Sequence, residues 1–331
     1  NKIGFNNFLR RYIYAFLIWL SFLLGSFFSF DIPWAQSLGI VIASFPYYIS
    51  MTMLSFDYSV EKFQTLIISF FHIIFIYSVC YVFYNFYIND FNSYSILHIL
   101  GLVDNRHEVG FKISIASVFL FVYYLNKSKY LIISILIISI SSMLIIESRS
   151  NILIYLISIF IFLFTNKIFS NLYTFLIVVF ISTFSFIQLS STFDSIENRF
   201  SFQDKQLASI NDRIYAIEKF PENFYNNLLG KGPKDIRFTN KSGVKMTYHN
   251  QYFTILTAGG LISMFVLIRL IYNFLYKSTK LLYSISLSRF NNSLLYVLLN
   301  ILLIFFTVEF LGFQWFLFFS LLIYFTKNSF E

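Results

Sequence analysis

Two arginines and a histidine lie in one polar stretch of a chain that is otherwise mostly apolar. Arg213 and Arg237 carry planar guanidinium groups, whose donors match the oxygens of a phosphate. His249 closes the stretch, and a neutral imidazole can accept a proton from a sugar hydroxyl near neutral pH. These residue types point to binding of an anionic group combined with general-base catalysis. The alternatives are a solvated loop for the arginines and an interfacial histidine without a role.

A glycine-rich turn interrupts the same stretch at residues 228–233. Gly230 and Gly232 allow the backbone to approach a ligand or another segment closely. No Gly-Lys-Ser/Thr sequence follows, so the turn is not a nucleotide-binding loop. We expect Gly230, Gly232 and Pro233 to shape this part of the chain.

A third arginine lies outside this stretch, in the polar sequence at residues 147–151. Arg149 lies between two short apolar runs. It is therefore expected at, or just below, the outer face of the membrane that the helices cross. An ionisable group at that depth is a functional candidate by default. The alternative is that Glu147 and Arg149 form only the polar tip of a hairpin.

The sequence predicts neither a metal site nor a cofactor. No second histidine or cysteine stands at ligand spacing, and no Asp-x-Asp pair is present to hold a divalent ion. Cys80 lies inside an apolar run and is interpreted as a small buried hydrophobic residue. Catalysis is therefore expected to be independent of metal ions.

Composition indicates a membrane protein. Of the 331 residues, 57% are hydrophobic and 12% are charged, whereas soluble domains have about 25% charged residues. Apolar runs that approach or exceed the roughly 17–25 residues of a spanning helix recur along the chain, which favours a helical bundle. The formal net charge is +8, but the sequence predicts no soluble basic domain on which this charge could be concentrated. Cationic inner loops and the polar stretch explain this charge, so we expect no nucleic-acid partner.

The runs predict an all-α polytopic membrane protein with about ten or more transmembrane helices. Cations in the short inner loops place both termini in the cytoplasm. Three segments follow: N-terminal helices one to seven at 1–189, one long outer loop at 190–252, and C-terminal helices at 253–331. The runs cover residues 12–30, 63–84, 111–125, 130–146, 152–165, 168–189 and 253–276, with a further run that ends near 54 and a stretch at 294–325 long enough for two spans.

Four short motifs follow one another along the chain. Residues 148–150 resemble a Ser-Arg-Gly motif, with Ser150 in place of the glycine. Residues 212–215, then 227–233, are similar to an arginine followed by Pro-Leu-Leu-Gly-x-Gly-Pro. Residues 249–253, then 258–262, are similar to His-Asn-x-x-Leu and Gly-Leu-Ile-Gly, and residues 105–111 more weakly resemble an Arg-x-x-Gly-Phe element. In this order the chain resembles the O-antigen polymerase and ligase superfamily, the membrane glycosyltransferases that handle undecaprenyl-diphosphate-linked glycans in bacterial envelopes.

The resemblance implies a GT-C-like helical bundle in the bacterial inner membrane, with a long periplasmic loop over an active site that faces the periplasm. The donor would be a glycan on undecaprenyl diphosphate, whose leaving group arginines would stabilise without a metal. By this resemblance Arg149, Arg213 and Arg237 bind the diphosphate, and Arg106 is a weaker fourth ligand. His249 would act as general base on the acceptor hydroxyl or would position that hydroxyl.

Our first functional hypothesis is a polymerase of O-antigen or a related surface polysaccharide. It would transfer the growing glycan from undecaprenyl diphosphate to the non-reducing end of a lipid-linked repeat unit. Partners would be this lipid-linked oligosaccharide, membrane lipids and a regulator of chain length. The alternative within the superfamily is an O-antigen ligase with lipid A core as acceptor, and a protein O-glycosyl ligase is a further one.

Two other classes remain open. A transporter or flippase of the lipid-linked oligosaccharide would need arginines within spans, and transporters often have broken helices at the midplane, of which we see none in the sequence. A structural membrane protein would show no dependence on Arg149 or His249.

Overall fold

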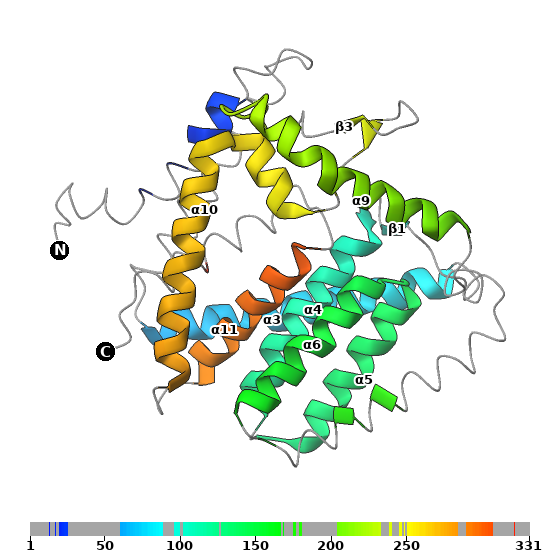
Figure 1. The fold of residues 1–331 in the computed structure, drawn as a ribbon. Helices are drawn as coiled ribbons and strands as arrows, with labels where there is room; N and C mark the ends of the chain where they lie inside the picture. The colour runs from blue at the N-terminus through cyan, green and yellow to red at the C-terminus, as the bar shows by residue number, and fades with distance from the viewer. Residues whose placement is uncertain are drawn as a thin grey trace. The chain divides into compact units, whose positions relative to one another are not determined.

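The computed structural model of the chain is mostly helical (Figure 1). It describes residues 13, 17, 20–25, 60–88, 96–99, 102–125, 127–166, 168, 175, 176, 179, 180, 204–232, 238, 239, 245, 246, 248, 250–283, 289–306 and 321. Its elements are α3 (Val60–Ile88), β1 (Ile96–Ile99), β2 (Leu102–Asn105), α4 (Arg106–Tyr124), α5 (Lys129–Ile145), α6 (Arg149–Thr165), α9 (Asp204–Tyr225), β3 (Phe238–Thr239), β4 (Lys245–Met246), α10 (Gln251–Tyr283) and α11 (Arg289–Ile304).

The chain divides into two compact units. The bundle unit comprises residues 60–204 and 286–304, with α3 to α6 and α11. The loop unit comprises residues 1–59, 205–285 and 305–331, with α9 and α10.

Five of the predicted apolar runs are helices. α3, α4, α5, α6 and α10 cover the runs at 63–84, 111–125, 130–146, 152–165 and 253–276. By length and composition, residues 64–88 and 251–276 qualify as membrane spans, and α5, α6 and α11 are shorter apolar helices. The remaining runs lie largely outside the described residues, so the total of about ten helices stays a prediction.

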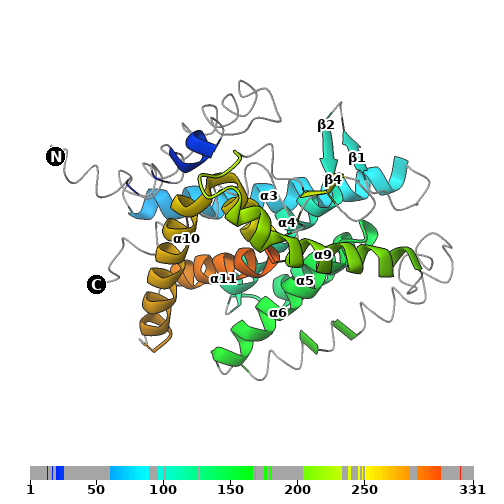
Figure 2. The ribbon, with the colours of Figure 1, turned by 45° about the horizontal axis from the view of Figure 1, so that its top comes forward.

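Two pairs of strands and one helix are additions to the sequence prediction. β1 pairs with β2, and β3 pairs with β4, in two short antiparallel ladders. The β1–β2 hairpin leads directly into α4 (Figure 2). Residues 190–252, predicted to be a loop, contain α9, a helix whose polar composition had concealed it.

α4 is the central helix of the bundle unit. Its side chains are buried almost continuously from Val109 to Val122, and it packs against α3, α5, α6 and α11. Phe119 stacks on Phe71 of α3 with 4.2 Å between ring centroids, and it meets Phe290 of α11 edge-on at 6.1 Å. These contacts hold α4 between α3 and α11.

A buried polar layer also joins the helices of this unit. The Asn300 side chain of α11 accepts a hydrogen bond from Ser114 of α4 at 3.0 Å and donates one to Ser158 of α6 at 3.0 Å. The hydroxyls of Ser117 and Ser139 join α4 to α5 at 2.6 Å. Such bonds help apolar helices to associate in lipid, where the hydrophobic effect does not drive association.

Cys80 is exposed on α3, so its interpretation as a buried residue is wrong. The reason is that the exposed face of this helix is itself apolar, with Ile73 66% and Ile76 58% exposed. On a helix that qualifies as a membrane span, an apolar residue can face lipid instead of the protein interior.

α10 bends sharply at Gly260, and the expectation of no broken helix is therefore wrong. Gly260 has φ 60° and ψ −148°, a conformation that is essentially confined to glycine. The short first part of the helix, in yellow, and the long second part, in gold, point in different directions (Figure 1). Residues 228–232 form hydrogen bonds with the backbone groups that the bend releases.

Candidate functional site

The turn between α5 and α6 places Arg149 at the first position of α6. Ser148 N donates to Met143 O at 3.0 Å and Glu147 N donates to Leu144 O at 2.9 Å, the two bonds of a helix end that usually requires glycine. Glu147 occupies the glycine position with φ 52°. The chain therefore stops and reverses within two residues, and Arg149 is exposed at the tip.

The first turn of α4 packs directly against this turn. The Asn151 amide Nδ2 donates to Ser148 Oγ at 2.8 Å and to the His107 carbonyl of α4 at 3.1 Å. A Cβ added at Gly110 would lie 2.6 Å from both Asn151 Nδ2 and Ser148 Oγ, so only glycine fits here without a shift. We call residues 106–110 and 147–151 together the arginine corner.

Ser150 replaces the glycine of the Ser-Arg-Gly motif, which had left the close packing of the hairpin open. In the structure the close approach occurs at Gly110, on the facing helix, and Ser150 is only partly buried. The substitution is therefore compatible with a tight turn.

Arg106 and Arg149 share the arginine corner although they are distant in sequence. Arg106 Nη1 lies 3.7 Å from Glu147 Oε2, and the two side chains are 24% and 3% exposed. Of the two residues in the alternative of a polar hairpin tip, Arg149 is exposed and Glu147 is buried. Glu108 and Lys112, both partly buried, add one charge of each sign in the first turns of α4. The start of α6 adds the positive end of a helix dipole next to Arg149.

The glycine-rich turn of the loop unit is bonded into the bend of α10. Lys231 N donates to Thr257 O at 2.9 Å, and Gly232 N donates to Ala258 O at 2.9 Å. In return Leu261 N donates to Leu228 O at 2.9 Å. The turn thus replaces helical bonds that the bend removes. We call residues 228–232 and 257–261 together the glycine junction.

Glycines make this contact possible because backbone lies directly on backbone. A Cβ at Gly260 would collide with the Leu228 carbonyl oxygen and come within 2.6 Å of Gly230 N. Gly230 has φ 89°, and a Cβ there would collide with the Ala258 carbonyl oxygen. Gly232 also has a positive φ, 76°, whereas Pro233 lies outside the described residues.

The residues beside His249 are held firmly, while His249 and Arg237 themselves lie outside the described residues. Tyr248 is buried, and its hydroxyl accepts a hydrogen bond from Asn223 Nδ2 of α9 at 2.9 Å. Asn250 Oδ1 accepts from the backbone N–H groups of Tyr252 and Phe253, at 3.0 and 3.2 Å, and so caps the start of α10.

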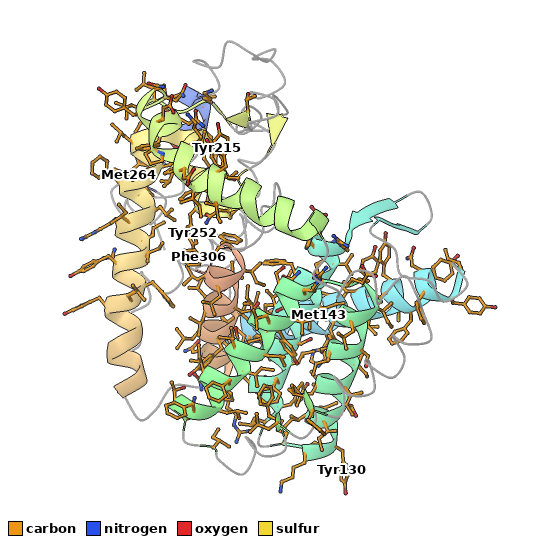
Figure 3. The ribbon with its side chains drawn as sticks, turned by 45° about the vertical axis from the view of Figure 1, so that its right-hand side comes forward. Tyr130, Met143, Tyr215, Tyr252, Met264 and Phe306 are labelled. Atoms are coloured by element: carbon orange, nitrogen blue, oxygen red, sulfur yellow. The ribbon has the colours of Figure 1, made fainter. Side chains whose placement is uncertain are left out.

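Aromatic rings join α9 to the start of α10. Phe220 stacks on Phe253 with 4.1 Å between centroids. The ring of Tyr252 lies 4.7 Å from that of Phe306 (Figure 3). Arg213 belongs to α9, one turn before Ala216, which is buried with Tyr248.

Gly110, Asn151 and Tyr248 shape these regions but were not among the predicted site residues. Only Gly110 carried a signal, since a glycine in an otherwise apolar helix often marks close packing. Among the described residues, no group of three His, Cys, Asp or Glu side chains is placed to hold a metal ion. The chemistry that the arrangement offers is binding of an anion by guanidinium groups.

Comparison with known proteins gives one family. Residues 134–268 match a family model described as O-antigen ligase. No curated protein and no solved structure matches the chain at a significant level. The matched segment contains Arg149, Arg213, the glycine junction and His249, whereas Arg106 precedes it. It therefore spans three of the four motifs that carry the resemblance.

Proposed function

We propose a polymerase function for this chain, which is a member of the O-antigen polymerase and ligase superfamily of membrane glycosyltransferases and ligases. It transfers a growing surface glycan from undecaprenyl diphosphate to the non-reducing end of a lipid-linked repeat unit. The arginine corner is the observation that supports this function most, because the start of α4, with Arg106, packs against the turn that carries Glu147 and Arg149. Cations gathered at one place suit a lipid diphosphate, whose negative charge grows as it leaves.

In the proposed reaction the acceptor hydroxyl oxygen attacks the anomeric carbon of the donor glycan. The bond from that carbon to the diphosphate oxygen breaks, and undecaprenyl diphosphate leaves with the electron pair. Arg149, Arg106, Arg213 and Arg237 offer paired N–H donors to the phosphate oxygens, so no metal is needed for the leaving group. His249 accepts the proton of the attacking hydroxyl, or orients that hydroxyl.

The setting we propose is the bacterial inner membrane, with about ten or more spans and the reaction on the periplasmic side. The alternative within the superfamily is an O-antigen ligase. The two differ in the acceptor, a lipid-linked repeat unit or lipid A core, and the arginine corner suits the donor of both.

The bend in α10 favours a second class, a transporter or flippase of the lipid-linked oligosaccharide. Broken helices in transporters present freed backbone groups to ions and substrates. Here the carbonyls of Thr257 and Ala258 already accept hydrogen bonds from Lys231 N and Gly232 N. These groups are taken up within the protein, so we place the transporter second.

The test uses purified protein in detergent with a synthetic lipid-linked repeat unit as the only substrate. We expect a ladder of products on a gel, unchanged by EDTA and absent in the His249→Ala variant. Transfer that occurs only after lipid A core is added would instead identify a ligase. If folded protein forms neither product, the glycosyltransferase assignment is wrong and the transporter becomes the favoured function.

A further inference from the structure

Glu147 stands at a backbone position that disfavours its side chain. It occupies the helix-ending position of α5 with φ 52°, where glycine is usual. A glycine there would form the same turn with less backbone strain. The carboxylate is thus present although the positive φ at this position is unfavourable for a residue with a side chain. This points to a role for Glu147 beyond making the turn.

The Glu147 carboxylate faces the guanidinium of Arg106. Oε2 lies 3.7 Å from Nη1, and the Glu147 side chain is 3% exposed while that of Arg106 is 24% exposed. A carboxylate so enclosed requires a compensating cation or hydrogen-bond donors. Glu147 therefore draws Arg106 towards the turn that also carries Arg149.

This pairing leaves much of Arg106 for another anion. A guanidinium has five N–H donors, and a separation of 3.7 Å exceeds the about 2.7–2.9 Å of a charge-assisted hydrogen bond. Arg106 is attracted by Glu147 but not saturated by it. The charge of Glu147 also reduces repulsion between Arg106 and Arg149, which allows both to stay on the same corner.

We propose that Glu147 is a positioning residue for the diphosphate site. It holds Arg106 on the corner of Arg149, so that both guanidinium groups meet the diphosphate of the lipid-linked donor. The inference rests on the proposed function of the arginine corner. It assigns Glu147 no contact with the substrate and no part in proton transfer.

Binding of undecaprenyl diphosphate to the full chain in detergent tests this role without turnover. Glu147→Gln keeps the shape and removes the charge, and we expect about tenfold weaker binding. Glu147→Asp should recover part of the affinity. Glu147→Gly removes the strain of the left-handed backbone conformation, so this variant should melt at the same temperature as Glu147→Gln or at a higher one. Its binding of undecaprenyl diphosphate should nevertheless stay weak. This combination separates positioning from a merely structural role.

A double variant tests whether Glu147 acts through Arg106. In an Arg106→Ala background, Glu147→Gln should produce no further loss of binding, because the residue it positions is gone. Glu222→Gln is the matched control, an exposed carboxylate bonded to Lys219 at 2.7 Å on α9, and its affinity should equal that of the wild type. Wild-type affinity in Glu147→Gln, or additive losses in the double variant, would overturn the positioning role. Failure of the wild type itself to bind would overturn the proposed function instead.

Discussion

The arginine corner and the glycine junction both join segments that are distant in sequence, but they use different groups. In the corner, side chains make the contacts: the Asn151 amide bonds Ser148 and α4, and the Glu147 carboxylate faces Arg106. In the junction, the backbone does so, through three N–H to C=O bonds between residues 228–232 and 257–261.

This difference explains which region is suited to chemistry. In the junction, the backbone N–H and C=O groups released by the α10 bend are hydrogen-bonded to residues 228–232. These groups are therefore not offered to a ligand. Side-chain contacts in the corner leave cations partly exposed, since Arg106 is paired at 3.7 Å and Arg149 is exposed. We therefore interpret the corner as a binding region and the junction as a structural element of the loop unit.

Adding one methyl group to each region should sharpen the contrast, with the largest effect at the junction. Gly260→Ala forces a residue with a side chain to φ 60° and drives its Cβ into the backbone of residues 228–230. We expect a loss of roughly 3 kcal/mol in stability, because neither the strain nor the clash can be relieved by a side-chain rotation. Thermal unfolding in detergent measures this change.

The same substitution at the corner should cost less. Gly110→Ala places its Cβ near the side chains of Ser148 and Asn151, which can shift, so we expect about 1–2 kcal/mol. The variant should also lose part of its product ladder, because Asn151 links α4 to the turn that carries Arg149. Equal melting temperatures for the two alanine variants would break the distinction between backbone and side-chain contacts.

The apolar helices were predictable and their partners were not. α3, α4, α5 and α6 follow from runs whose length and apolarity a membrane helix requires. α9 was missed because its charges resemble those of a solvated loop, and the aromatic contacts that hold it, such as Phe220 on Phe253, join segments far apart in sequence.

The site shows the same limit. The motifs identified Arg106 and Arg149 as candidates, but only the structure packs the start of α4, with Arg106, against the turn that carries Arg149. Gly260 carried a local signal in the sequence Ala-Gly-Gly. Its partner at residues 228–232 could not be read locally, since backbone pairing leaves no side-chain pattern.

The most direct test of the central claim compares three arginine variants in the assay with a lipid-linked repeat unit. Arg289 is an exposed arginine at the first position of α11 in the same unit, so Arg289→Ala controls for loss of charge. We predict that Arg149→Ala abolishes the product ladder with unchanged folding, that Arg149→Lys restores little because a point charge lacks the paired donors, and that Arg289→Ala keeps the ladder. A full ladder from Arg149→Ala would contradict the account of the arginine corner as the diphosphate site.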